Sequence, residues 1–228
     1  MRTDDLIASV IKNLIAKNPD LPLDKIDDVV IGCANQAGED NRNIARMALL
    51  LAGLPVSVPG ETVNRLCASG MSAVAQAMRA IKSGEGDLFI AGGVEGMSRG
   101  PYVISKAENG FATDQKMYDS SFGWRFVNPE MEKTYGVEAM GKTAENLAEM
   151  YKITREEQDE FALNSQMKAT KAQESGRLAE EISDIQIPQR KGDPILVNKD
   201  EFIKPNSSLE ILGKLKPAFV KENGSVTA

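Results

Sequence analysis

Residues 61–97 constrain the fold of this chain most, because they predict a strand, a turn, a helix, a second turn and another strand in direct succession. Residues 61–66 alternate in the manner of a strand. A helix is indicated next, because apolar side chains recur at spacings of four and three positions and glycines then end the pattern (Val74, Met78, Ile81, Gly84 and Gly86). Residues 87–91 form a short apolar run, which is typical of a buried parallel strand. This succession predicts an α/β fold.

Cys67 lies at the turn before the predicted helix, beside the small residues Ala68, Ser69 and Gly70, which let another backbone pass closely. A thiol at a helix N-terminus faces unpaired backbone N–H groups and the positive end of the helix dipole. Both favour the thiolate, which is the nucleophilic form, and a sharp turn would expose the sulfur as in the nucleophile elbow of hydrolases. A second interpretation stays open at this point, because a free cysteine is often a small buried apolar side chain.

The segment VNRLCASGMSAV, followed by AGGVEGMS, resembles the acyl-enzyme cysteine segment of the thiolases, the acetyl-CoA acetyltransferase family. The match has no gap and includes Asn64, Arg65, Cys67, Ser69, Gly70, Ala91, Gly92, Gly93, Glu95, Met97 and Ser98. The resemblance continues through residues 32–55, 123–146 and 214–228, so it covers essentially the whole chain. The stretches GWRFVNP and CANQAGEDNRN are most similar to the β-ketoadipyl-CoA thiolase branch.

The resemblance implies an α/β thiolase-like fold, with an incomplete N-terminal half and an inserted α+β loop domain. Residues 1–97 would form the N-terminal thiolase domain without its first strand, and residues 98–228 the loop domain on the CoA-binding side. It also implies that the Cys67 thiolate attacks an acyl-CoA thioester and holds the acyl group, which splits one difficult step into two easier ones. The implied activity is that of an acyl-CoA C-acyltransferase that forms or cleaves a 3-oxoacyl-CoA. Coenzyme A and acyl-CoA would be substrates, and no cofactor is expected.

By the same resemblance, six positions would contact the substrate or CoA: Met140, Lys204, Leu215, Ala218, Phe219 and Ala228. Met140 would line the acyl and pantetheine tunnel, and Lys204 would meet the nucleotide phosphates. Basic residues gather in the same part of the sequence (Arg190, Lys191, Lys199, Lys204, Lys214, Lys216 and Lys221), and on an acidic protein they would attract the phosphates of CoA. The alternatives are a core position for Met140 and an ordinary solvated surface for the lysines.

Composition excludes several other classes of protein. The net charge of −6 argues against general nucleic-acid binding, and two cysteines do not make a disulfide framework. The longest apolar runs are too short to cross a bilayer, and the acidic N-terminus does not resemble a secretory signal. A cytoplasmic protein is expected. No metal site is expected either, because the chain has no histidine and its two cysteines are far apart.

The histidine count of zero also bears on activity. Thiolases use a histidine and a second cysteine from a C-terminal domain, and Cys33 does not match that second cysteine. The resemblance therefore implies a fragment that does not turn over alone, while the full-length protein would be a homodimer or homotetramer. The missing first strand is central in the family's sheet, so its neighbours are expected to have unpaired edges and the isolated chain to be marginally stable or to aggregate.

Local patterns predict further elements. Thr3 is expected to cap a helix that ends at Asn18, and residues 27–31 and 44–52 are expected to form a strand and a helix. Residues 98–139 show little periodicity, and their Trp124 and Phe126 are expected in the core, with a place in the lining of a pocket as the alternative. Helices are predicted over 143–151 and from a capping box at Thr154 to about residue 174, followed by short strands at 185–187 and 195–197.

Two competing functions remain. A β-ketoacyl synthase shares the fold and a cysteine nucleophile but would need an acyl carrier protein as its partner. The loop-domain match through GWRFVNP and KLKPAF argues against it. A non-catalytic, thiolase-like interaction fragment is the alternative from another class, and the absence of histidine supports it.

Overall fold

The computed structural model describes residues 1–227. Internal contacts divide the chain into two compact units. The first unit contains Met1–Arg125 and Ile185–Ile195, and the second contains Phe126–Asp184 and the residues from Leu196 onward. Among the described residues, no helix combines the length and hydropathy that a membrane crossing requires.

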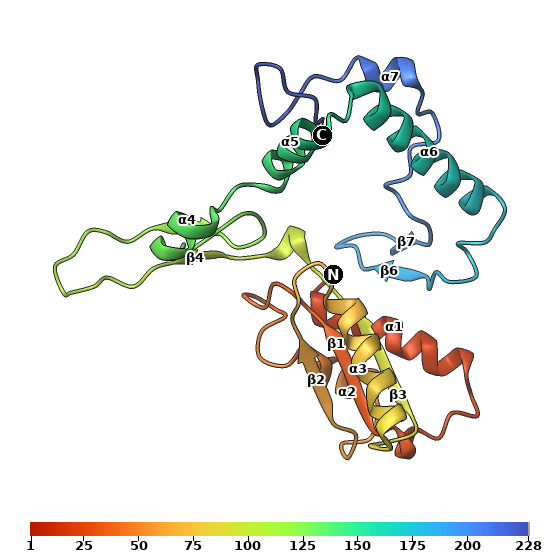
Figure 1. Cartoon of the computed structure of the whole chain (residues 1–228). Helices are drawn as coiled ribbons and strands as arrows, with labels where there is room; N and C mark the ends of the chain where they lie inside the picture. Colours follow the sequence, from red (N-terminus) through yellow and green to blue (C-terminus); the bar gives the residue numbers. More distant parts are fainter. Residues whose placement is uncertain (228) are drawn as a thin grey trace. The chain divides into compact units, whose positions relative to one another are not determined.

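A three-stranded parallel sheet forms the centre of the first unit, with the order β2-β1-β3 (Figure 1). Its strands are β1 (Asp28–Gly32), β2 (Gly60–Val63) and β3 (Phe89–Gly93). Val30 of β1 lies opposite Glu61 on one side and Ala91 on the other. β1 has a hydrogen-bonded neighbour on both sides, whereas β2 and β3 are the edge strands of this sheet, so the expectation of unpaired edges stays a prediction about those two strands.

Helices cover both faces of this sheet. They are α1 (Thr3–Lys17), α2 (Ile44–Ala52) and α3 (Ser69–Ser83), and a short 3₁₀ helix, η1 (Leu23–Lys25), leads into β1. Val29 and Ile31 lie in one apolar cluster with α1 and α2, and since side chains alternate along a strand, Val30 faces the other way. That other face is covered by α3, which contacts β1 and β3 (Figure 1). Among the described residues, all buried apolar side chains lie between Ile7 and Ile90.

The helix predicted after Cys67 is confirmed as α3, but its apolar stripe does not face the sheet. Val74, Met78 and Ile81 are 55%, 47% and 47% exposed, whereas Ala73 and Ala77 are buried. The physical reason is close approach: small side chains let the helix axis lie near the strands, so the larger side chains are left on the outer face.

The N-terminal helix is also confirmed, with one correction. Thr3 is the first helical residue and is buried, while Arg2 is the N-cap and makes no side-chain cap hydrogen bond. The guanidinium of Arg2 instead pairs with the carboxylate of Asp4 at 2.8 Å. The helix ends at Asn18 as expected, and α2 has the predicted bounds with Gly53 as its left-handed C-cap.

The irregular stretch contains short elements that periodicity does not reveal: η2 (Met97–Arg99), β4 (Tyr102–Ile104), β5 (Met117–Asp119) and α4 (Pro129–Tyr135). The strands β4 and β5 form an antiparallel pair. Trp124 and Phe126 are both exposed in this structure. Their expected core position is wrong, since about half of each side chain is exposed among the described residues.

The remaining elements are α5 (Met140–Tyr151), α6 (Arg155–Glu174), β6 (Ile185–Ile187), β7 (Ile195–Val197) and α7 (Leu209–Gly213). The strands β6 and β7 form a separate two-stranded sheet. The capping box at the start of α6 is confirmed: the Thr154 hydroxyl accepts from the Glu157 amide, and the Glu157 carboxylate accepts from the Thr154 amide.

Candidate functional site

Cys67 lies between the end of β2 and the start of α3, at the carboxyl edge of the parallel sheet. Two glycines explain how the first turn of α3 reaches this edge. A Cβ on Gly32 would overlap the backbone of Ser69, and a Cβ on Gly93 would lie 3.2 Å from the Gly32 carbonyl oxygen. The carboxyl edge of a parallel sheet is where α/β proteins bind their ligands.

The turn that carries Cys67 is unusual in its backbone. Leu66 has a φ of +49°, which is uncommon for a residue other than glycine and costs energy. Side chains hold the turn in place: the Ser69 hydroxyl accepts from the Arg65 amide at 2.8 Å and donates to the Leu66 carbonyl at 2.6 Å. The Asn64 carboxamide oxygen accepts from the Leu66 amide at 2.9 Å. The thiol of Cys67 is exposed on this turn.

A second loop is tied to the same edge. The Glu95 carboxylate accepts from the backbone amides of Ala34 and Asn35 at 2.9 and 3.0 Å. The Asn64 side chain donates to the Ala34 carbonyl at 3.0 Å. Glu95 and Asn64 therefore join the loops that surround the Cys67 turn. Sequence reasoning found both residues only as matching positions, because their partners lie 61 and 30 residues away.

Cys33 contrasts with Cys67 in exposure. It is 1% exposed, and burial, followed by the nearby charges of Glu95 and Asp40, raises its pKa to about 12. A thiol in this state is protonated and inert at neutral pH.

Cys33, Asp40 and Glu95 also bring their donor atoms within 4.8 Å of one another, as metal ligands would. However, each donor has a partner within the chain: the Cys33 thiol donates to the Asn35 carbonyl, and Asp40 accepts from the Gly38 amide. Both oxygens of Glu95 accept from backbone amides. Hydrogen bonding therefore accounts for this cluster.

The structure places Cys67 in the first unit and the other described candidate residues in the second. Ala228 lies outside the described residues. Met140 is the exposed first residue of α5. Its neighbour Gly141 lies against the ring of Phe219, since a Cβ there would overlap the ring. The amide of Ala218 donates to the Val226 carbonyl at 3.0 Å. Met140, Ala218 and Phe219 are thus brought together.

Leu215 and Lys204 are fixed by contacts to α6. The Arg155 guanidinium donates to the Leu215 carbonyl at 3.0 Å. The Lys204 amide donates to the Gln166 side chain at 2.8 Å, and its ammonium lies 5.2 Å from the centre of the Phe202 ring. Lys204 is exposed, so its charge is available to an anion.

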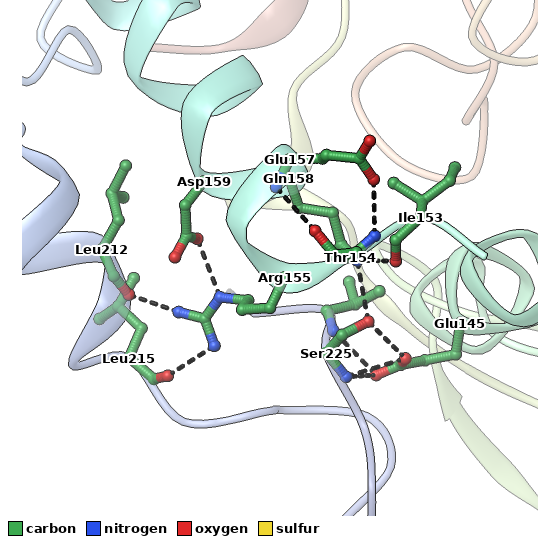
Figure 2. Close-up of polar contacts among 11 residues, drawn as sticks. Glu145, Ile153, Thr154, Arg155, Glu157, Gln158, Asp159, Leu212, Leu215 and Ser225 are labelled. Carbon is green, nitrogen blue, oxygen red and sulfur yellow. Dashed lines mark hydrogen bonds and ion pairs between the residues drawn. The ribbon is translucent and has the colours of Figure 1, made fainter.

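Glu145 is a residue of the second unit that sequence reasoning missed. Glu145 of α5 is 8% exposed, and its carboxylate accepts from the amides of Ser225 and Val226 at 3.0 and 2.9 Å (Figure 2). It also accepts from the Ser225 hydroxyl at 3.2 Å. Burial would raise the pKa of Glu145, but these hydrogen bonds and the charge of Lys142 together outweigh it, so its pKa is lowered. Glu145 is therefore a buried carboxylate that organises the loop beside Phe219.

Comparison with known proteins connects these observations. Residues 1–228 match the family model described as the thiolase N-terminal domain. The chain is 54% identical over 228 residues to a β-ketoadipyl-CoA thiolase of Acinetobacter baylyi, a match that covers 100% of this chain and 57% of that protein. The 3-oxoadipyl-CoA/3-oxo-5,6-dehydrosuberyl-CoA thiolase of Escherichia coli matches with the same values, 54%, 100% and 57%. The chain spans about half the length of the curated relatives it matches.

A solved structure agrees with these matches. The crystal structure of the Bacillus anthracis acetyl-CoA acetyltransferase has a TM-score of 0.86 and 36% sequence identity to this chain. The match covers 100% of this chain and 55% of that one. The α/β thiolase-like fold expected from the sequence is confirmed.

Proposed function

Because this chain belongs to the thiolase family, we propose that Cys67 is the acyl-accepting nucleophile of an acyl-CoA C-acyltransferase. The observation that carries the proposal is the exposed thiol on a positive-φ turn at the N-terminus of α3. Its thiolate attacks the carbonyl carbon of an acyl-CoA, the bond from that carbon to the CoA sulfur breaks, and CoA leaves as a thiolate. The acyl group then passes to the α-carbon of a second acyl-CoA, which loses a proton, and the bond to the Cys67 sulfur breaks. In the cleavage direction the thiolate attacks the 3-oxo carbon of a 3-oxoacyl-CoA, the bond between C2 and C3 breaks, and the released acyl-CoA takes up a proton at C2. The thiolate of free CoA then removes the acyl group from Cys67.

The proposed substrate class follows from the relatives. Both curated relatives named above are thiolases of β-ketoadipyl-CoA or 3-oxoadipyl-CoA, so we take a 3-oxoacyl-CoA with a free carboxylate at the far end of its acyl chain as the substrate. Such a reaction serves the degradation of aromatic compounds. Coenzyme A acts as substrate, and the mechanism uses no cofactor.

Proton transfer in this mechanism needs a group that these 228 residues do not contain. The chain has no histidine, and Cys33 is buried with a raised pKa. The base and the second cysteine are proposed to come from the part of the relatives that this chain does not span. The 228 residues alone are therefore expected not to turn over.

Binding of CoA is assigned to residues of the second unit. Lys204 would meet the phosphates, and the group of Met140, Leu215, Ala218 and Phe219, with Ala228, would contact the pantetheine and adenine. In functional terms the chain divides at residue 97, with the nucleophile before it and the CoA contacts after it. A cytoplasmic homodimer or homotetramer is proposed for the full-length protein.

An acylation experiment tests the nucleophile. The protein as its source produces it is mixed with acetyl-CoA, quenched in acid and digested, and the Cys67 peptide is expected to carry one acetyl group. Cys67→Ala abolishes the adduct, and Cys33→Ser is the matched control that keeps it. An adduct on Cys33, or none with acetyl-CoA but one with an acetylated carrier protein, would overturn the proposal, and the second result would favour a synthase.

A further inference from the structure

The last described part of the chain, residues 212–226, is held by two charged side chains of the second unit. We call residues 212–226 the C-terminal segment. It contains three of the six residues proposed to contact the substrate or CoA, Leu215, Ala218 and Phe219, and leads to another, Ala228. Most of it is irregular, since α7 ends at Gly213. Something outside its own backbone must therefore fix its shape.

Arg155 holds the beginning of this segment (Figure 2). Its guanidinium donates to the carbonyl oxygens of Leu212 and Leu215, at the C-terminal end of α7. The Asp159 carboxylate accepts from the Nε of Arg155 at 2.9 Å and fixes the guanidinium in place. The carbonyls at a helix C-terminus lack intrahelical partners, so a cation in this position satisfies both their hydrogen bonds and the helix dipole.

Glu145 holds the end of the segment. Its carboxylate accepts from two successive backbone amides, those of Ser225 and Val226, and from the Ser225 hydroxyl. Gln158 adds a contact from α6, because its side chain donates to the Ser225 hydroxyl oxygen at 2.9 Å. Hydrogen bonds to a carboxylate are about twice as strong as those between neutral groups.

The two ends are connected through the middle of the segment. The Ala218 amide donates to the carbonyl of Val226, whose own amide donates to Glu145, so a residue held by Glu145 determines where Ala218 lies. The ring of Phe219 packs on Gly141, one turn before Glu145 on α5. Displacement of residues 225–226 would therefore move both Ala218 and Phe219.

We propose that Glu145 and Arg155 are positioning residues that hold the C-terminal segment in the shape that binds the pantetheine and adenine part of CoA. This inference rests on the proposed function, because it assumes that the segment meets CoA. Neither residue touches the substrate in this assignment. Each acts through backbone groups of the segment.

Two measurements on each variant separate the inference from the proposed function. The first is amide hydrogen exchange of residues 225–226, which needs no ligand. The second is the dissociation constant of CoA, measured by calorimetry on the protein as its source produces it. Glu145→Gln is the informative variant, because it keeps the size of the side chain but points an NH₂ group at an amide donor. Glu149→Gln is the matched control, since Glu149 is an exposed glutamate of the same helix.

In Glu145→Gln, exchange at residues 225–226 should accelerate and the dissociation constant of CoA should rise, each by about ten-fold, as expected for the loss of a charge-assisted hydrogen bond. Arg155→Lys should weaken CoA binding less than Arg155→Met, because it keeps the cation. The alkylation rate of Cys33, which is buried in the folded protein, should stay unchanged in all variants. That result would exclude general unfolding as the cause.

Several results would overturn the inference. Exchange at residues 225–226 that is equal in Glu145→Gln and wild type would show that Glu145 does not hold the segment. Faster exchange with CoA affinity unchanged would show that the segment's shape does not matter for CoA. If wild type binds no CoA while exchange responds as expected, the proposed function fails, and the structural role of Glu145 stands alone.

Discussion

The two cysteines of this protein should differ sharply in their reaction with iodoacetamide. Cys33 has a pKa of about 12, raised by burial and by the charges of Glu95 and Asp40, against an ordinary value of 9.0. At about pH 8, a pKa of 12 leaves roughly one thiol in ten thousand ionised, whereas a pKa of 9 leaves roughly one in ten. Because only the thiolate reacts, unfolding should accelerate alkylation of Cys33 about a thousand-fold from ionisation alone.

Burial further increases the ratio of the Cys33 alkylation rates in the unfolded and folded chain. Cys33 is 1% exposed, so the reagent cannot reach its sulfur in the folded chain. Cys67 is exposed on its turn, so its alkylation should be complete while Cys33 is still unmodified. The assay is peptide mass spectrometry over a time course, in buffer and in concentrated urea. Cys67→Ala and Cys33→Ser assign the two rates.

The reasoning would be refuted by a folded-state rate for Cys33 within ten-fold of its rate in urea. It would also be refuted if Cys33 reacted before Cys67 in the folded protein. The first result would mean that the core around β1 opens readily. The second would mean that the Cys67 turn is covered, which would remove the observation on which the proposed nucleophile depends.

Three further predictions concern stability, each measured by urea unfolding. Gly32→Ala should lower the free energy of unfolding by about 1–3 kcal/mol, because its Cβ would overlap the first turn of α3, whereas Gly110→Ala, which meets open space, should be nearly neutral. Glu39 has its pKa lowered to about 2, chiefly by its hydrogen bond from Arg99. Ionised Glu39 therefore stabilises the fold fully above its ordinary pKa of 4.5, and this stabilisation is lost as pH falls towards 2. Glu39→Gln should accordingly reduce the difference in the free energy of unfolding between about pH 6 and about pH 3. Thr154→Ala should cost about 1 kcal/mol by removing the capping box of α6, and no measurable loss would mean that the box does not stabilise this helix.

Local patterns predicted the regular elements of both units where the forces that form them are local. The apolar runs of β1 and β3, the Gly53 cap and the capping box at Thr154 are all visible within a few neighbouring residues. The orientation of α3 was not visible in this way. Periodicity identified the stripe of Val74, Met78 and Ile81 correctly as helical, but burial was decided by Gly32 and Gly93, which allow the alanine face to approach the sheet.

The residues that hold the second unit together could not be found from the sequence pattern, because each one has the residue type and spacing of an ordinary surface residue. Arg155 and Asp159 are four positions apart on a helix, which is the spacing of a solvent-exposed ion pair. The same guanidinium, however, reaches carbonyl oxygens 57 and 60 residues further along the chain. Glu145 is likewise one of several glutamates on α5 and α6, and only its partners, 80 and 81 residues away, distinguish it. A nucleophile can be recognised from the few residues around it, but the side chains that position a binding loop are defined by contacts that exist only in the folded chain.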